Sequence, residues 1–188
     1  MFSYYSSTIF KREDVLKLGD REEIIVPEGI EEIDDRAFKS CKNLRKITLP
    51  NSLKRIGAKA FLKCESLEEI VIPEGVESIG EDCFCECENL QKVNLPNSLK
   101  KIETYTFSSC NSLEEIVIPE GIEEIDDRAF ISCKNLRKIT LPNSLKKIRD
   151  FAFSYCNSLE EIVISEGVEE ICDNALSYCD NLKKNNFT

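Results

Sequence analysis

The sequence of 188 residues contains no histidine and no tryptophan, and it has a single methionine. Histidine is the most frequent general base of enzymes and a frequent zinc ligand, so its absence removes most familiar catalytic and zinc arrangements. No glycine-rich phosphate loop occurs either. We therefore expect no enzyme, no cofactor and no metal site.

Positive charge and long apolar segments are scarce as well. Lys and Arg number 25 against 35 Asp and Glu, a net charge of −10, and this argues against nucleic acid as a partner because phosphate binding depends on clustered Lys and Arg. The longest apolar run has three residues, as in Ile70-Val71-Ile72, whereas a membrane-spanning helix needs about 20. The start, Met1 to Lys11, does not have the pattern of a secretory signal. If the protein is exported, its signal has been removed or the chain is a part of a longer protein.

What the sequence does contain is a repeat of 23 residues. All six prolines follow this spacing, from Pro27 to Pro142, and Ser165 takes the seventh position. Cysteines and phenylalanines keep the same spacing at Cys41, Cys64, Cys87, Cys110, Cys133, Cys156 and Cys179, and at Phe38, Phe61, Phe84, Phe107, Phe130 and Phe153, with Leu176 in the last unit. Such self-similarity indicates a solenoid. Seven units occupy residues 27–187 as a single domain, and residues 1–26 are expected to form an N-terminal cap.

Within one unit the apolar positions combine two periods. Leu44, Ile47 and Leu49 end in alternation, which is typical of a short strand with one buried face, whereas Ile33 and Ala37 are four residues apart, as in a helical turn. We expect each coil to run strand, turn, short helix, turn, an α/β repeat. A unit this small cannot bury both of its faces, so the coils must stack and their strands must form a parallel sheet.

One unit reads Leu44-x-x-Ile47-x-Leu49-Pro50-x-Ser52-Leu53-x-x-Ile56-Gly57-x-x-Ala60-Phe61-x-x-Cys64. It closely resembles the BspA-like, or Treponema-type, leucine-rich repeat family, although the usual Asn or Cys three residues after the strand motif is Ser52 or Gly75 here. The resemblance covers residues 24–187. It implies a curved leucine-rich repeat solenoid with a parallel β-sheet on the concave face and a second extended segment near Ile30 to Ile33. It also implies a cell-surface or secreted protein that binds a protein ligand, often in adhesion.

The units come in two alternating forms, Pro-Glu-Gly-(Ile/Val)-Glu and Pro-Asn-Ser-Leu-Lys, which we call E units and K units, so the full period is 46 residues. The outward strand position alternates accordingly through Glu23, Lys46, Glu69, Lys92, Glu115, Lys138, Glu161 and Lys184. Opposite charges on adjacent strands contribute roughly 0.2 to 1 kcal/mol per pair. We interpret the alternation as control of stacking, because neighbours of the same form would repel each other.

Three cysteines depart from the repeat. Cys83 occupies a position that other units fill with alanine and is expected in the core, whereas Cys85 and Cys172 are expected at the surface. The repeated cysteines of adjacent coils should lie about 5 Å apart, a distance that a disulfide tolerates. Because side chains in such a column point the same way, we expect reduced, buried thiols that fill space.

Aromatic residues replace polar ones at outward positions near the end of the chain, at Tyr105, Phe151, Tyr155 and Tyr178. Phe151 and Tyr155 are four residues apart and Tyr178 is one unit beyond Tyr155, so these three are expected to cluster on the flank away from the sheet. Clustered exposed aromatic residues are typical of protein interfaces. The four are therefore candidate partner-binding residues, and the alternative is partial burial beneath neighbouring coils.

The two ends differ from the repeat. Apolar residues at the coil spacing, Phe10, Val15, Leu18, Ile24 and Val26, indicate a degenerate first coil that acts as a cap. In the last unit Asn185 replaces a core isoleucine, and the coil beneath it is expected to expose apolar side chains. Such an end favours a homo-oligomer or a continuation of the protein. Two functions stay open: binding of a different protein, and self-association as a structural or assembly module through the aromatic flank or the C-terminal end.

Overall fold

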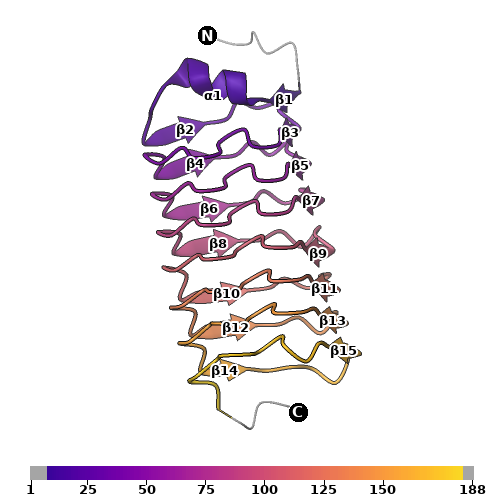
Figure 1. The fold of residues 1–188 in the computed structure, drawn as a ribbon. Coiled ribbons are helices and arrows are strands. Elements are labelled where there is room, and N and C mark those ends of the chain that lie inside the picture. The colour runs from indigo at the N-terminus through magenta and orange to yellow at the C-terminus, as the bar shows by residue number, and fades with distance from the viewer. Residues whose placement is uncertain (1–7, 184–188) are drawn as a thin grey trace.

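The computed structural model describes residues 8–183, which form a stack of coils (Figure 1). One face carries the strands β2 (Glu23–Ile25), β4 (Lys46–Thr48), β6 (Glu69–Val71), β8 (Lys92–Asn94), β10 (Glu115–Val117), β12 (Lys138–Thr140) and β14 (Glu161–Ile162). A second face carries β1 (Ile9–Phe10), β3 (Glu32–Ile33), β5 (Arg55–Ile56), β7 (Ser78–Ile79), β9 (Lys101–Ile102), β11 (Glu124–Ile125), β13 (Lys147–Ile148) and β15 (Glu170–Ile171). Within the described residues no helix is long and apolar enough to cross a membrane.

Neighbouring strands on both faces are parallel and one repeat apart in register. Ile24 pairs with Ile47 on the first face, and Ile33 pairs with Ile56 on the second. This arrangement confirms the stacked solenoid and the second extended segment, which β3 provides. Each strand of the first face buries its central residue and exposes the two beside it, the alternation that the sequence predicts.

The segment between the second strand and the next coil is not the short helix that the four-residue spacing predicts. The N–H groups of Arg36, Phe38 and Ser40 donate to carbonyl groups of the following coil at 2.8–2.9 Å, and the residues between them donate three positions back. Arg36 and Ser40 have φ angles of 58° and 59°. A helix would send every N–H four residues back, whereas here about half of these donors bind the adjacent coil, so the segment is a run of turns that adds to the stack.

The core consists of columns that run along the stack. The repeated phenylalanines are fully buried, and successive rings from Phe10 to Phe153 lie nearly parallel, with centroids 5.0–5.7 Å apart. Phe10 extends this column to the N-terminal end, where the repeat position itself holds the smaller Val15. Isoleucine and leucine columns surround the rings, so each coil buries its apolar side chains against the coils above and below it.

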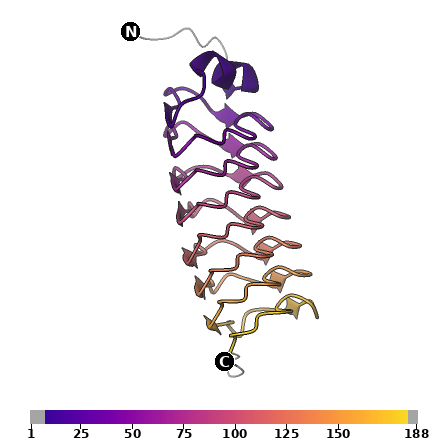
Figure 2. The same cartoon turned by 60° about the vertical axis from the view of Figure 1, so that its left-hand side comes forward.

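Helix α1 (Arg12–Leu18) lies across the N-terminal end of the stack (Figures 1 and 2). It buries Val15, and the Arg12 guanidinium donates to the carbonyl oxygens of Ala37 at 3.2 Å and Lys39 at 3.0 Å in the first full coil. The polar groups at that end of the turn segment are thereby satisfied by a side chain in place of another coil.

The last described coil is less covered than the others. Both residues of β15 are exposed, and Ile171 has 37% of its surface accessible, whereas the equivalent Ile148 is fully buried. Apolar side chains are therefore accessible in this coil within the described residues. The expectations that concern Lys184, Asn185, Asn186 and Phe187 lie outside the described residues.

Candidate protein-binding face

The first face presents two parallel rows of outward side chains. One row is the predicted alternation of Glu and Lys, and Lys46 lies 3.9 Å from Glu69 on the adjacent strand. We count each strand with the loop that follows it, so β2, β6, β10 and β14, which precede a Glu-Gly loop, are E strands, and β4, β8 and β12, which precede an Asn-Ser loop, are K strands. In the second row aliphatic residues occupy the E strands and polar residues the K strands. Ile25, Val71, Val117 and Val163 expose 75%, 62%, 64% and 53% of their surfaces. A regular row of exposed aliphatic side chains is unusual on a strand face that has no cover.

The strands of this face associate in pairs (Figure 1). Each E strand pairs with the following K strand through three residues, as β10 does with β12. The step from β4 to β6 pairs one residue, the step from β12 to β14 pairs two, and no pairing joins β8 to β10. The strand pairing on this face therefore repeats every two coils, in agreement with the 46-residue period of the sequence.

The loops after the strands explain this pairing. In the step from β2 to β4, the Ser52 hydroxyl donates to the Ile30 carbonyl at 2.7 Å and accepts from the Gly29 N–H at 3.0 Å. The Glu28 carboxylate accepts from the Asn51 N–H at 3.3 Å. Equivalent serine bonds join the E loop to the K loop at Ser98 and Ser144. The residues that distinguish E units from K units thus bind an E coil to the K coil that follows it.

Grooves open on the first face at the less paired steps. The groove between β4 and β6 has a volume of about 380 Å³, and the one between β12 and β14 about 340 Å³. The groove between β8 and β10, which we call the middle groove, is about 700 Å³. Its lining consists of Gln91, Lys92, Val93, Asn94, Leu95, Ser112, Glu114, Glu115, Ile116, Val117 and Pro119. Concave sites with apolar walls and a few polar groups are the usual places for ligands.

The middle groove lies where the strand sequence departs from the repeat. Gln91 stands where the other K units have Arg45 and Arg137, Val93 stands for isoleucine, and Asn94 stands for threonine. The second face is interrupted next to it, because β7 and β9 do not pair and Ser78 replaces a charged residue there. The sequence interpretation missed this site. The three departures within four residues, at Gln91 just before β8 and at Val93 and Asn94 on it, were the signal that could have identified it.

The four aromatic candidates make two kinds of ring contact. The Arg128 guanidinium lies between two rings, 5.7 Å from the centroid of Tyr105 and 5.0 Å from that of Phe151. Tyr155 and Tyr178 stack with centroids 4.6 Å apart and expose 43% and 60% of their surfaces. The ring contacts of the described residues include a Tyr155–Tyr178 stack and a Phe151–Arg128 cation–π contact, and the cluster of Phe151 with the two tyrosines stays a prediction.

The backbone explains the outward placement of these rings. Tyr105, Phe151, Tyr155 and Tyr178 all have φ angles between 56° and 62°. Lys59 and Lys63 occupy the same positions of another coil with φ angles of 58° and 61°. The left-handed conformation therefore belongs to the coil and not to the aromatic residues, and it does not by itself mark a functional site.

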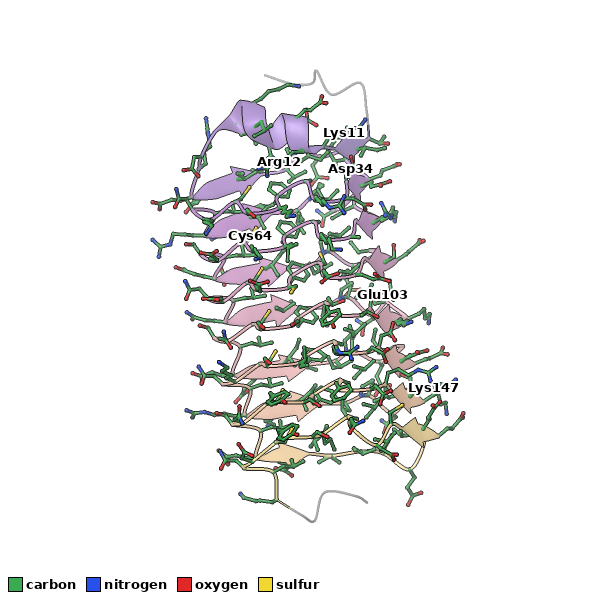
Figure 3. All side chains as sticks on the ribbon, in the orientation of Figure 1. Lys11, Arg12, Asp34, Cys64, Glu103 and Lys147 are labelled. Atoms are coloured by element: carbon green, nitrogen blue, oxygen red, sulfur yellow. The ribbon has the colours of Figure 1, made fainter. Side chains whose placement is uncertain are left out.

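The cysteines are all free, and seven of them are buried. In the repeated column six of the seven thiols donate to the carbonyl oxygen of the phenylalanine in the previous coil at 3.0–3.2 Å, as Cys64 does to Phe38. Cys64 is labelled in Figure 3. The seventh, Cys41, accepts from Arg12 Nη1 at 3.5 Å. This confirms reduced thiols that fill the core. Burial raises the pKa of Cys64 well above its usual value.

The prediction that Cys85 lies at the surface is wrong. Its side chain is only 8% exposed, because it lies in a row between the two left-handed positions of the turn segment, beside the buried Leu62 and Ser108. Burial raises the pKa of the Cys85 thiol to about 11. Cys172, also predicted at the surface, is partly exposed. Among residues 8–183 no three side chains of the kinds that bind metals come together.

The fold and the strand face define a leucine-rich repeat solenoid. Residues 17–111 and 78–188 match the family model of the BspA type leucine rich repeat region. The chain therefore belongs to the BspA-type leucine-rich repeat family, as its strand motif and spacing indicated.

Solved structures of similar proteins share the fold. The leucine-rich repeat protein of T. pallidum has a TM-score of 0.85 at 31% identity, over 89% of this chain and 80% of that one. A leucine-rich repeat protein from Eubacterium ventriosum has a TM-score of 0.80 at 30% identity, over 84% of this chain and 43% of that one. A leucine rich cell surface protein from Faecalibacterium prausnitzii has a TM-score of 0.52 at 27% identity, over 86% of this chain and 52% of that one. This chain thus spans about half the length of the latter two. Among curated proteins none matches the sequence.

Proposed function

We propose that the protein is a non-enzymatic binding module that holds another protein against its first strand face. The observation that carries this proposal is the row of exposed aliphatic side chains at Ile25, Val71, Val117 and Val163 beside three grooves. A rigid stack presents these features at constant spacing, so a partner meets a preformed surface and little ordering is required on binding.

A role at the cell surface or in secretion, as an adhesin or antigen, forms part of the proposal. Its support is the similarity to a leucine rich cell surface protein from Faecalibacterium prausnitzii. The absence of histidine from the sequence, and of any group of three potential metal ligands among residues 8–183, fits a module that binds without a reaction.

The experiment measures binding of the purified protein to a panel of purified extracellular proteins by biolayer interferometry, followed by variants of the first face and of the flank. Val71→Glu with Val117→Glu places charges in the aliphatic row and should weaken binding at least tenfold. Tyr155→Ala with Tyr178→Ala alters the aromatic flank and should leave binding unchanged. The reverse result would move the binding surface to the flank, and failure to bind any protein of the panel would contradict the adhesin role.

Self-association is a second candidate, and the observation that favours it is the exposed Tyr155–Tyr178 stack next to the less covered last coil. Tyrosine combines a large apolar area with little conformational entropy to lose, which suits an interface. Light scattering on a size-exclusion column over a concentration series tests this candidate. A dimer that dissociates on dilution and is lost in Tyr178→Ala would support it, whereas a monomer at every concentration would leave these rings for a different partner.

A further inference from the structure

The polar side chains of the middle groove have no partners. Gln91, Lys92, Asn94, Glu114 and Glu115 make no side-chain hydrogen bond and no ion pair within the described residues 8–183. They line a groove whose walls also include the apolar Val93, Leu95, Ile116 and Val117. These five side chains are exposed, so water solvates them in the free protein, and their charges and amide groups are available to a ligand that enters the groove.

One of the two equivalent steps shows an arginine in this place, whereas between β12 and β14 the Glu160 carboxylate lies 4.0 Å from the Lys183 ammonium instead. Between β4 and β6 the Arg45 guanidinium donates to the Glu68 carboxylate through Nη2 at 2.6 Å and Nε at 2.9 Å. Arg45 and Glu68 do not line the groove at that step, whereas Gln91 and Glu114, at the same repeat positions, both line the middle groove. Gln91 is neutral and too short to replace the guanidinium, so Glu114 keeps a free carboxylate.

We propose that the middle groove binds an arginine side chain of the partner protein. This side chain would take the role that Arg45 has at its own step and that Gln91 cannot fill. The guanidinium would bind the Glu114 carboxylate as Arg45 binds Glu68, with Glu115 as a second acceptor. Its aliphatic stem would pack on Val117 and Leu95, which lie beside the carboxylates. This proposal rests on the proposed function, because it names the chemistry that the first face recognises.

Charge complementarity favours this occupant over an anionic one. Two carboxylates and one ammonium line the groove, and the whole chain has a net charge of −10. A phosphate or a carboxylate would meet Glu114 and Glu115 with a single Lys92 to offset them. Arginine also suits the site better than lysine, since a planar fork of donors can bind a carboxylate through two N–H groups.

The test uses a peptide probe and not the unidentified partner. Acetyl-Gly-Arg-Gly-amide is titrated into the 15N-labelled protein, and amide shifts are followed by NMR. The citrulline peptide, which has the same shape without the charge, is the matched control. We expect millimolar binding, with shifts confined to the backbone amides of Gln91, Asn94, Glu114 and Val117, and binding at least tenfold weaker for the citrulline peptide.

Three variants make the result specific. Glu114→Gln should weaken binding of the arginine peptide about tenfold, whereas Glu160→Gln, at the same repeat position of another E unit, should not change it. Gln91→Arg installs the guanidinium that Arg45 supplies at its own step and should abolish binding by pairing with Glu114, as Arg45 pairs with Glu68. Because each change is made at an exposed side chain, amide spectra that stay dispersed will show that the variants are folded.

Equal shifts with both peptides, shifts elsewhere on the surface, or unchanged binding by Gln91→Arg would overturn the proposal. These failures are distinct from failure of the proposed function. A protein partner that loses affinity in Val71→Glu with Val117→Glu while the arginine peptide does not bind would keep the first face as the binding surface and remove the arginine site.

Discussion

Phenylalanine rings contact each other at every step of the stack. Six successive ring contacts run from Phe10 to Phe153. The interplanar angles range from 5° to 16°, and the rings are fully buried. Each inner ring therefore contacts a ring above and a ring below, and removal of one ring opens a cavity between two neighbours that the backbone hydrogen bonds hold apart.

Phe107→Ala should lower the free energy of unfolding by about 3–5 kcal/mol, the usual range for a buried phenylalanine. Phe151→Ala should lower it by less than about 1 kcal/mol, because that ring is only half-buried and stacks on Arg128 at the surface. Urea unfolding followed by circular dichroism measures both values. An equal loss in the two variants would show that Phe151 belongs to the core and is not available to a partner.

The cysteines supply a second test at this scale. Under native conditions at pH 8 a maleimide should label no more than three thiols per chain, those of Cys41, Cys172 and Cys179, which are partly exposed. Cys85 should stay unlabelled, because with a pKa of about 11 only about one molecule in a thousand carries the thiolate at that pH. Mass spectrometry of labelled peptides identifies the sites, and labelling in urea provides the control. Rapid native labelling of Cys85 would contradict its burial.

At the scale of the elements, the second face is held by short strands and by ion pairs between them. The Lys101 ammonium on β9 lies 2.9 Å from the Asp126 carboxylate and within 4 Å of Glu103 and Glu124. Partial burial acts to raise the pKa of Asp126, but the hydrogen bonds that the carboxylate accepts from Lys101, the Asp127 N–H and Thr104 outweigh it and lower that pKa. The pKa of Lys101 is raised, because its acidic neighbours outweigh desolvation.

These shifts define the pH range in which the pair stabilises the fold. The depressed pKa of Asp126 contributes stability above its usual value near 3.8, and this contribution is lost as the pH falls through the lower folded value. The raised pKa of Lys101 contributes below its usual value of 10.5, and this is lost as the pH rises through the higher folded value. Lys101→Met should therefore lower the free energy of unfolding by about 0.5 kcal/mol near neutral pH, because both groups are still partly exposed and water screens their interaction.

The measurement is urea unfolding of Lys101→Met and the unsubstituted protein from pH 2.5 to pH 9. The difference in stability should shrink as the pH falls below 3.8 through the depressed folded pKa of Asp126, because the carboxylate then becomes protonated in both states. Lys17→Met is the control, since its ion pair with Asp14 lies at the exposed surface of α1 and should make little difference at any pH. A difference for Lys101→Met that persists at low pH would mean that the methionine perturbs packing instead.

For the whole molecule, the alternation of E and K units makes two coils the repeating unit of stability. Loop bonds join each E coil to the K coil after it, and ion pairs such as Arg45–Glu68 cross the next step. Any rearrangement that keeps the alternation should preserve these contacts, whereas one that breaks it places like charges on adjacent strands.

Two deletions separate these cases. Removal of residues 73–118 takes out 46 residues and leaves β6 followed by an E loop and then by β12, so the alternation survives. Removal of residues 73–95 takes out 23 residues and places Glu69 beside Glu115 and Arg55 beside Lys101. Added salt, from about 0.05 to 0.5 M, should stabilise the protein that lacks residues 73–95, because salt screens this repulsion. It should not stabilise the protein that lacks residues 73–118. Thermal unfolding measures both, and the same salt response in the two would show that the charges do not control stacking.

The period, the parallel stack and the buried columns followed from the sequence alone, because repeated apolar positions specify which side chains each coil must bury against the next. Leu176 marked the C-terminal end of the phenylalanine column, whereas its N-terminal extension through Phe10 was visible only in the structure, because the repeat position there holds Val15. The turn segment and the burial of Cys85 required the tertiary structure, because about half of the N–H groups of that segment bind a neighbouring coil. A four-residue spacing in the sequence cannot show such bonds between coils. The middle groove also required the tertiary structure. The sequence shows that Gln91 replaces an arginine, but not that a groove opens beside it, because the groove exists only where β8 and β10 lie side by side without pairing.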